Sequence, residues 1–297
     1  MPTIRFCVYQ YQHLPFDQLF ERWERAEGLG FDVIWNVDTV VEPDRPRATL
    51  FDGPTTLAAM ALRTSKIRIG TLVTSLFFRS PVLASRAAIA VDHLSAGRVE
   101  VALGAGDPTA GPAAAGVRPD SPADQVARFR EFVELIDRLL RTDVTTYAGR
   151  FFWCEEAETI PGPVQRPRPP ITVAAHGPRM LRVAADFADA WSSWGGYGIE
   201  TEEHFLSVTR ERAARFDDFC VERGRDPGMI RHSLVCFPPL TPWESIEYFR
   251  NMVGEFGAIG IDEFVLYWPR TWREAPHEDS VFERVALDVM NEIRREA

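Results

Sequence analysis

Short apolar segments alternate with amphipathic helical segments along this chain, and the alternation restricts the possible folds more than any other feature. Eight segments have the length and apolar character of β-strands: residues 4–10, 31–38, 66–75, 99–106, 171–175, 189–194, 230–237 and 262–268. Segments with apolar residues at helical spacing follow them, at residues 16–30, 54–64, 81–95, 123–142, 178–187, 201–223, 242–257 and 280–295. Eight strand–helix pairs in succession predict an α/β fold, the (β/α)8 TIM barrel with insertions.

A doubly wound parallel sheet is the alternative fold. It would bring fewer strands in this length and a Gly-x-Gly-x-x-Gly turn after the first strand, where this chain has YQHLPFD. Residues 142–170 interrupt the alternation, because YAGRFFW is typical of a short hairpin arm and PGPVQRPRPP cannot be helical. We interpret this segment as an insertion in a single barrel domain that spans residues 1–297.

Composition excludes several classes of protein. The net charge of −10 disfavours a nucleic-acid surface, which needs clustered positive charge. The four cysteines stand far apart and form no C-x-x-C pair, so we expect neither a zinc site nor a disulfide framework. No signal-peptide pattern and no apolar run of about 20 residues is present. We therefore expect a cytoplasmic protein with no membrane or nucleic-acid partner and no metal.

The predicted strand ends supply the candidate pocket residues, because reacting groups of such barrels sit at the carboxyl ends of the strands. These are Gln10, Gln12, His13, Asp38, Thr74, Ser75, Gly104, Ala105, Gly106, Asp107, Ala175, His176, Gly177, Trp194, Phe237 and Trp268. The set holds no paired carboxylates, no H-E-x-x-H, no G-x-S-x-G and no phosphate-binding Walker loop. Small, aromatic and backbone-rich strand ends suit a bound cofactor that performs the chemistry.

Three segments carry a family resemblance. Residues 69–106, IGTLVTSLFFRSPVLASRAAIAVDHLSAGRVEVALGAG, resemble the luciferase-like monooxygenase superfamily of flavin- and deazaflavin-dependent oxidoreductases. AEGLGFDVIWNVD and PPITVAAHGPRMLRVAADFADAW are similar to two further segments of that superfamily. The resemblance implies a (β/α)8 barrel with insertions, in agreement with the eight strands counted independently.

The resemblance assigns the cofactor ring to two neighbouring strand ends. The superfamily's third strand ends in a bulge with a non-prolyl cis peptide against the ring, and the matching step here lies near Leu72–Val73, followed by Thr74. Gly104, Ala105, Gly106 and Asp107 match the loop that lies along the cofactor. Without its flanking residues, this loop would be interpreted as a tight βα turn. With the flanking motif, a cofactor-binding loop is the favoured interpretation. We expect small residues in this loop because they let the backbone approach the ligand closely.

A second segment resembles the superfamily's phosphate-binding turn. It consists of Ala175, His176, Gly177, Pro178 and Arg179. Gly177 and Pro178 start a predicted helix, whose first N–H groups lack internal partners and whose dipole favours an anion. His176 either contacts the phosphate or the substrate, or caps the pocket wall.

Candidate catalytic residues are Asp38, His13 and His176. Asp38 occupies the place of an acidic strand-two residue of the superfamily, although Thr39 replaces the His that often follows it. His13 either faces substrate or is a solvated loop residue. Gln10, Trp194 and Trp268 are the candidate substrate-pocket residues, and for the two tryptophans plain core packing is the alternative.

The resemblance also implies a reaction class. We expect a coenzyme F420-dependent oxidoreductase that transfers a hydride between the deazaflavin and a small organic substrate. The alternative is an FMN-dependent luciferase-like monooxygenase supplied with reduced flavin by a separate reductase; a third possibility is a non-catalytic flavin-binding barrel. Relatives commonly form homodimers through barrel helices, which we expect here. One departure is that Asp107, Gly111 and Pro112 stand where many members carry a bulky aromatic, an acidic residue and a His.

Overall fold

Eight parallel strands form a closed barrel in the order β1-β10-β9-β8-β7-β4-β3-β2 in the computed structural model, which describes residues 3–41, 49–107, 111–269 and 279–296. The barrel strands are β1 (Arg5–Tyr9), β2 (Val33–Asn36), β3 (Arg68–Ser75), β4 (Val99–Gly104), β7 (Ile171–Ala174), β8 (Ala190–Ser193), β9 (Arg231–Val235) and β10 (Glu263–Tyr267). Each falls within one of the eight predicted segments. The predicted barrel is confirmed, and an open doubly wound sheet is excluded.

Helices follow the strands as the apolar spacing predicted. They are α1 (Phe16–Gly28), α2 (Gly53–Arg63), α3 (Pro81–Leu94), α4 (Pro122–Arg141), α5 (Pro178–Phe187), α6 (Glu202–Glu222), α7 (Ile246–Gly257), α8 (Asp279–Arg284) and α9 (Met290–Glu296), with a π-helical turn over Val285–Val289. Short 3-10 helices cover Pro112–Ala115 and Pro227–Met229. Among these residues no helix is both long enough and apolar enough to cross a membrane.

One helix begins later than predicted. Helix α7 starts at Ile246 and not at residue 242, because Ser245 is its N-cap and accepts a hydrogen bond from the Tyr248 N–H. The Glu244 N–H instead closes a turn onto the carbonyl oxygen of Thr241. A serine that caps a helix sets its first residue, and apolar spacing alone does not report that position.

The chain divides into two compact units that each use several chain segments. Unit 1 comprises Met1–Gln10, Arg25–Ile34 and Ala175–Ala297, and unit 2 comprises Tyr11–Glu24 and Trp35–Ala174. The prediction of a single domain with one insertion stays a prediction, and the two units are described separately below.

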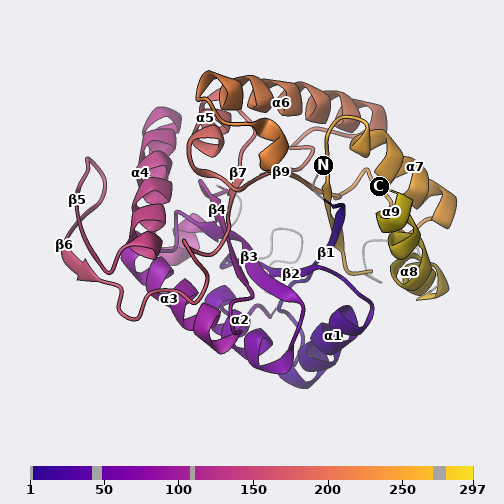
Figure 1. Cartoon of the computed structure of the whole chain (residues 1–297), viewed down its shortest axis with the longest axis horizontal. Coiled ribbons are helices and arrows are strands. Elements are labelled where there is room, and N and C mark those ends of the chain that lie inside the picture. Colours follow the sequence, from indigo (N-terminus) through magenta and orange to yellow (C-terminus); the bar gives the residue numbers. More distant parts are fainter. Residues whose placement is uncertain (1–2, 42–48, 108–110, 270–278, 297) are drawn as a thin grey trace. The chain divides into compact units, whose positions relative to one another are not determined.

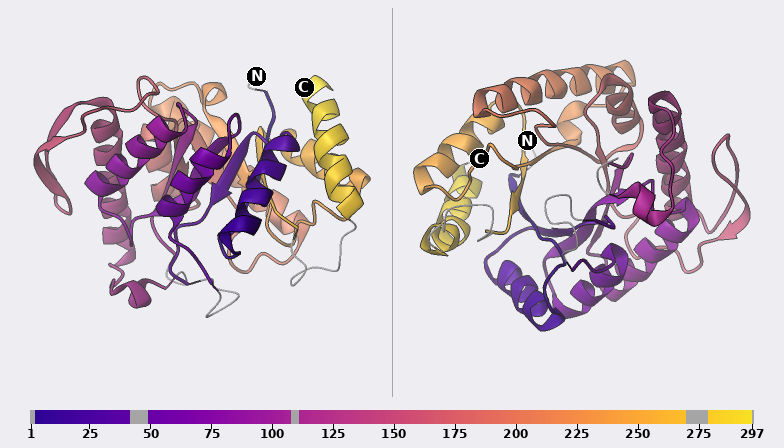
Figure 2. Two further views of the ribbon diagram at one scale, coloured as in Figure 1. Left: turned by 90° about the horizontal axis from the view of Figure 1, so that it is seen from below. Right: turned by 180° about the vertical axis from the view of Figure 1, so that it is seen from behind.

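In unit 2, strands β3, β4 and β7 pair in parallel, and helix α3 packs between α2 and α4. The predicted hairpin in the insertion is present as the antiparallel strands β5 (Val144–Ala148) and β6 (Trp153–Glu158). Figures 1 and 2 show this hairpin beyond the outer side of α4. The Glu131 carboxylate of α4 accepts the N–H groups of Arg150, Phe151 and Phe152, so the hairpin turn is fastened to that helix.

In unit 1, strands β1, β10, β9 and β8 pair in parallel, and helices α5 and α6 lie side by side (Figure 1). Aromatic rings fill the layer between strands and helices. The centroid of the Phe6 ring lies 5.6 Å from that of Phe249 and 5.9 Å from that of Phe264. Buried aromatic rings contribute large apolar areas, so this layer fixes the helices of unit 1 against its strands.

Candidate active site

Strand β3 carries a bulge at the position that the family resemblance assigned to the cofactor ring. Its register against β4 shifts between Thr71 and Thr74, and the Leu72–Val73 peptide bond is cis. Leu72 is buried, and Val73 is partly exposed. The bulge therefore lies at the predicted step of the chain, and the contact of Leu72 and Val73 with a cofactor stays a prediction.

Two glycines, Gly104 at the end of β4 and Gly106 in the loop after it, are required by the protein's own side chains. A Cβ on Gly104 would lie 2.2 Å from Val73 Cγ2, and a Cβ on Gly106 would lie 2.5 Å from Phe77 Cδ2. Gly106 also has a φ of 88°, which favours glycine. The absence of a side chain at these two positions therefore accommodates Val73 and Phe77, and the close approach of a ligand to this loop stays a prediction.

The rest of this loop is tied to helix α4. Gln125 Nε2 donates to the carbonyl oxygen of Ala105 at 2.8 Å and to that of Gly106 at 3.3 Å. Asp107 is partly exposed and follows directly. Because the Gln125 amide holds two successive carbonyl groups, the loop that contains Ala105 and Gly106 is a fixed part of unit 2.

Asp38, the acidic candidate at the end of β2, is held in an ion pair. Its carboxylate accepts from Arg79 Nη2 at 2.6 Å and Arg79 Nε at 3.0 Å, and from the Ser75 N–H at 3.3 Å. Arg79 also pairs with Asp52, the N-cap of α2. The hydrogen bond to Asp38 raises the pKa of Arg79 against the opposing effect of burial. Asp38 thus joins β2, the end of β3 and α2, an arrangement that suits positioning of the bulge.

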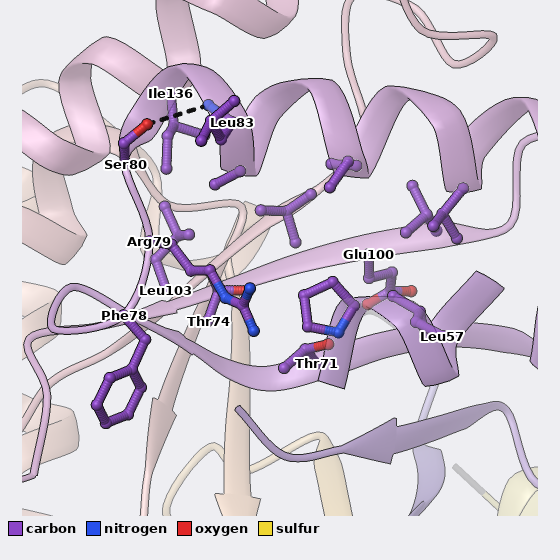
Figure 3. Close-up of a pocket in the computed structure, with 17 residues that line it drawn as sticks. Leu57, Thr71, Thr74, Phe78, Arg79, Ser80, Leu83, Glu100, Leu103 and Ile136 are labelled. Atoms are coloured by element: carbon purple, nitrogen blue, oxygen red, sulfur yellow. Dashed lines mark hydrogen bonds between the residues drawn. The ribbon is translucent and has the colours of Figure 1, made fainter. Parts of the chain in front are cut away.

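A cavity of about 150 Å³ lies behind the bulge, between helix α3 and strands β3 and β4. Figure 3 shows the guanidinium of Arg79 inside it. Most of its wall is apolar, and Thr74 also lines it. The structure therefore places Thr74 on a cavity that faces a helix, while its predicted cofactor contact is untested.

In unit 1, the start of helix α5 has the features predicted for an anion site. Gly177 is the N-cap with no side-chain cap, and Pro178 occupies the first helical turn. Gly177, Pro178 and Arg179 are exposed. Two residues before Gly177, Ala175 is held by two hydrogen bonds: its N–H donates to the Ser192 carbonyl oxygen, and its own carbonyl oxygen accepts from Trp191 Nε1. The N–H groups of the first turn are therefore available to a ligand at a rigid position.

His176 lies between this turn and the end of β8. Its Nε2 accepts a hydrogen bond from the Trp194 N–H at 3.2 Å, and its ring centroid is 5.6 Å from that of Trp194. Burial, together with the positive charge of Arg212, lowers the pKa of His176 to about 4. The ring is thus neutral at physiological pH. His176 is therefore a poor candidate for a cationic acid.

Arg212 of helix α6 is a site residue that sequence reasoning missed. Its Nη1 donates to the carbonyl oxygens of Trp194 at 2.8 Å and Gly195 at 2.9 Å. Within the described residues no carboxylate lies at ion-pair distance from it, and burial lowers its pKa. A partly buried arginine in the middle of a helix gives no sequence signal among the many arginines of this chain.

The candidate substrate-pocket residues differ in their surroundings. Gln10 is 3% exposed, and neither its Oε1 nor its Nε2 has a partner among the described residues. Trp194 contacts Tyr197 and Phe237, with ring centroids 5.1 and 6.4 Å apart. Trp268 packs on Phe282, at 5.0 Å between centroids, which is a packing role. An unpartnered buried amide is costly, so Gln10 is the strongest of the three as a ligand contact.

The last catalytic candidate, His13, is partly exposed in the segment between β1 and α1. The neighbouring Gln12 uses its amide internally, because Nε2 donates to the carbonyl oxygens of Val37 and Phe51 and Oε1 accepts from the Val37 N–H. The described residues contain no group of His, Cys, Asp and Glu that could hold a metal ion.

Comparisons with known proteins show the family and the fold of this chain. The model of the luciferase-like monooxygenase family matches residues 3–241. The F420-dependent glucose-6-phosphate dehydrogenase of Intrasporangium calvum is 29% identical over 239 residues, which are 75% of this chain and 71% of that protein.

Solved structures with the same fold include two different cofactor types. An F420-dependent secondary alcohol dehydrogenase in complex with an F420–acetone adduct has a TM-score of 0.79 at 19% identity, covering 98% of each chain. A type II Baeyer–Villiger monooxygenase of Pseudomonas putida in complex with FMN has a TM-score of 0.74 at 12% identity, covering 98% of this chain and 99% of that one. At such identities these likenesses show the fold.

Proposed function

Because this chain belongs to the luciferase-like monooxygenase family of oxidoreductases, we propose that it is a coenzyme F420-dependent oxidoreductase that transfers a hydride between the deazaflavin and a small organic substrate. The observation that carries the proposal is the similarity, over three quarters of the chain, to a relative named as F420-dependent. We do not assign that relative's substrate to this chain, because the two proteins are only 29% identical and the match covers 71% of the relative.

The residues present fit such a cofactor in two respects. The uncapped start of α5 at Gly177 and Pro178 suits the coenzyme's phosphate, with Arg179 as a nearby cation. The buried Gln10 amide has one donor and one acceptor without partners among the described residues, which suits a ligand with a polar edge. We assign the ring to the bulge at Leu72–Val73 and to the loop from Gly104 to Asp107, as the family resemblance implies.

In this proposal the protein's residues bind and orient. The first N–H groups of α5 would hold the anion, and the Gln10 amide would fix the orientation of a polar group. Asp38 and Arg79 would keep the β3 bulge in place through their ion pair. When bound, coenzyme F420 would supply a ring that accepts or donates a hydride.

The runner-up is an FMN-dependent monooxygenase served by a flavin reductase. The family's description supports it only in naming a monooxygenase. Titration of the purified apoprotein with both coenzymes separates the two proposals. We expect F420 to bind and to be reduced or oxidised in the presence of a substrate. Tight FMN binding without F420 binding, together with reductase-dependent oxygen consumption, would establish the runner-up. Binding without turnover by any donor would indicate a non-catalytic flavin-binding barrel.

We also propose a homodimer formed through barrel helices. Leu62 of α2 is 68% exposed and Leu83 of α3 is 67% exposed, which supports a contact on these helices. Light scattering that gives the 33.6 kDa mass of one chain at micromolar concentration would contradict this.

A further inference from the structure

Arg212 is placed to act on His176 through one residue, Trp194. The Trp194 carbonyl oxygen accepts from Arg212 Nη1 at 2.8 Å, and the Trp194 N–H donates to His176 Nε2 at 3.2 Å. The Gly195 carbonyl oxygen accepts from the same Arg212 nitrogen at 2.9 Å. Helix α6 therefore fixes the backbone on which the His176 ring rests.

The hydrogen bond from Trp194 determines which ring nitrogen carries a proton. Because Nε2 accepts, it is unprotonated, and the proton of the neutral ring must sit on Nδ1. No protein partner of Nδ1 is found among the described residues. The neutral ring thus has one N–H donor available to a ligand.

Burial opposes protonation of the second nitrogen most, and two further effects add to it. A proton on Nε2 would face the Trp194 N–H and break the hydrogen bond that orients the ring. It would also place a second positive charge near the Arg212 guanidinium, whose charge is not neutralised by a carboxylate at ion-pair distance in the described chain. Both effects depend on Arg212, the first through the position of Trp194 and the second through charge.

We propose that Arg212 is a positioning residue that keeps His176 neutral with its single proton on Nδ1, so that His176 donates a hydrogen bond to a ligand oxygen and does not serve as an acid. The donor role toward a ligand rests on the proposed function, because a phosphate or carbonyl oxygen is the acceptor that such a cofactor or its substrate would bring. The tautomer itself does not depend on any ligand.

Nitrogen-15 NMR of histidine-labelled protein without ligand tests the tautomer directly. We expect the His176 signals at pH 7 to show a protonated Nδ1 and an unprotonated Nε2, with a titration midpoint near 4. A protonated Nε2 at pH 7, in either the neutral or the cationic ring, would overturn the proposal.

Variants of Arg212 test its part in the effect. We expect Arg212→Met to raise the His176 titration midpoint by about one pH unit or more and to mix the two tautomers. Arg212→Lys keeps the charge and one donor, so it should retain most of the wild-type behaviour. Arg210→Met, at an exposed position of the same helix, is the matched control and should change neither readout. An Arg212→Met protein with the wild-type tautomer and midpoint would contradict the assignment.

Two further outcomes are decisive. If Arg212→Met does not fold, Arg212→Gln, which keeps side-chain N–H donors but removes the charge, replaces it. We expect this variant to raise the His176 titration midpoint, and an unchanged midpoint would overturn the proposal. If the tautomer is as expected but neither F420 nor phosphate changes the Nδ1 signal, the positioning role stands and the proposed function fails at this site.

Discussion

Arg79 and Arg212 each hold a segment near the end of a barrel strand, Arg79 through carboxylates and Arg212 through backbone carbonyl groups. In unit 2, Arg79 forms ion pairs with Asp38 and Asp52, and Asp38 also accepts the Ser75 N–H. In unit 1, Arg212 donates to the Trp194 and Gly195 carbonyl oxygens, with no carboxylate at ion-pair distance among the described residues. The first cluster has one guanidinium and two carboxylates and so carries a net negative charge, whereas the second keeps a positive charge.

From this difference we infer that the Arg79 cluster stabilises the protein, whereas the region around Arg212 binds the ligand. The Arg79 cluster stabilises the bulge but offers little to an anion, because two carboxylates already engage the Arg79 guanidinium. An arginine bonded to carbonyl groups retains its field, and it lies near a helix start that itself favours anions. We therefore expect changes in unit 2 to act mainly on stability and changes in unit 1 mainly on ligand binding.

The largest effect should come from the matched pair Arg79→Met and Arg212→Met. Arg79→Met leaves Asp38, whose side chain is 4% exposed, as a buried unpaired charge and should lower the free energy of unfolding by about 3 kcal/mol. Arg212→Met removes hydrogen bonds to carbonyl groups and should cost about 1 kcal/mol. Urea denaturation measures both. Equal losses in the two variants would remove the distinction between the clusters.

A glycine pair tests how tightly each region is packed. Gly104→Ala brings a Cβ to 2.2 Å from Val73 and should cost about 2 kcal/mol, with partial recovery in the double variant with Val73→Ala. Gly177→Ala meets no atom within 4 Å and should cost less than about 1 kcal/mol. Thermal melting of all three proteins provides the measurement. If Val73→Ala gave no recovery, the contact would not explain the loss.

These contrasts also show what the sequence could predict. The start of α5 was predicted correctly because Gly177 and Pro178 mark it locally, and the eight strands were found because apolar spacing is a local property. The Asp38–Arg79 pair joins residues 41 positions apart, and the contact of Gly104 with Val73 spans two strands. Such partners depend on strand order and register, which spacing along one chain does not specify.

The pH dependence of stability should distinguish His176 from the acidic cluster. Because burial and Arg212 lower the folded pKa of His176 from 6.5 to about 4, the unfolded chain binds a proton over this range that the folded chain does not. Stability should therefore fall as pH decreases from 6.5 to 4, by up to about 2 kcal/mol. His176→Gln should remove this part of the acid sensitivity. An unchanged pH profile in that variant would mean that His176 titrates normally.

The smallest expected effect concerns the exposed Arg179 at the start of α5. Arg179→Ala should weaken coenzyme F420 binding by about 1 kcal/mol, roughly fivefold, because a solvated charge contact contributes little. Arg182→Ala is the control, since the Arg182 guanidinium lies over the Phe219 ring, 4.1 Å from its centroid. Fluorescence titration measures both affinities. A larger loss with Arg182→Ala would place the anion elsewhere on the helix.

The most direct test of the account compares coenzyme F420 with the same deazaflavin lacking its phosphate and acidic tail, titrated against the wild type, Arg212→Met and Arg79→Lys. The account predicts that the phosphate-free compound binds at least about tenfold more weakly to the wild type. This preference should shrink in Arg212→Met and persist in Arg79→Lys. Equal affinities of the two compounds for the wild type, or a preference lost only in Arg79→Lys, would contradict the assignment of anion binding to unit 1.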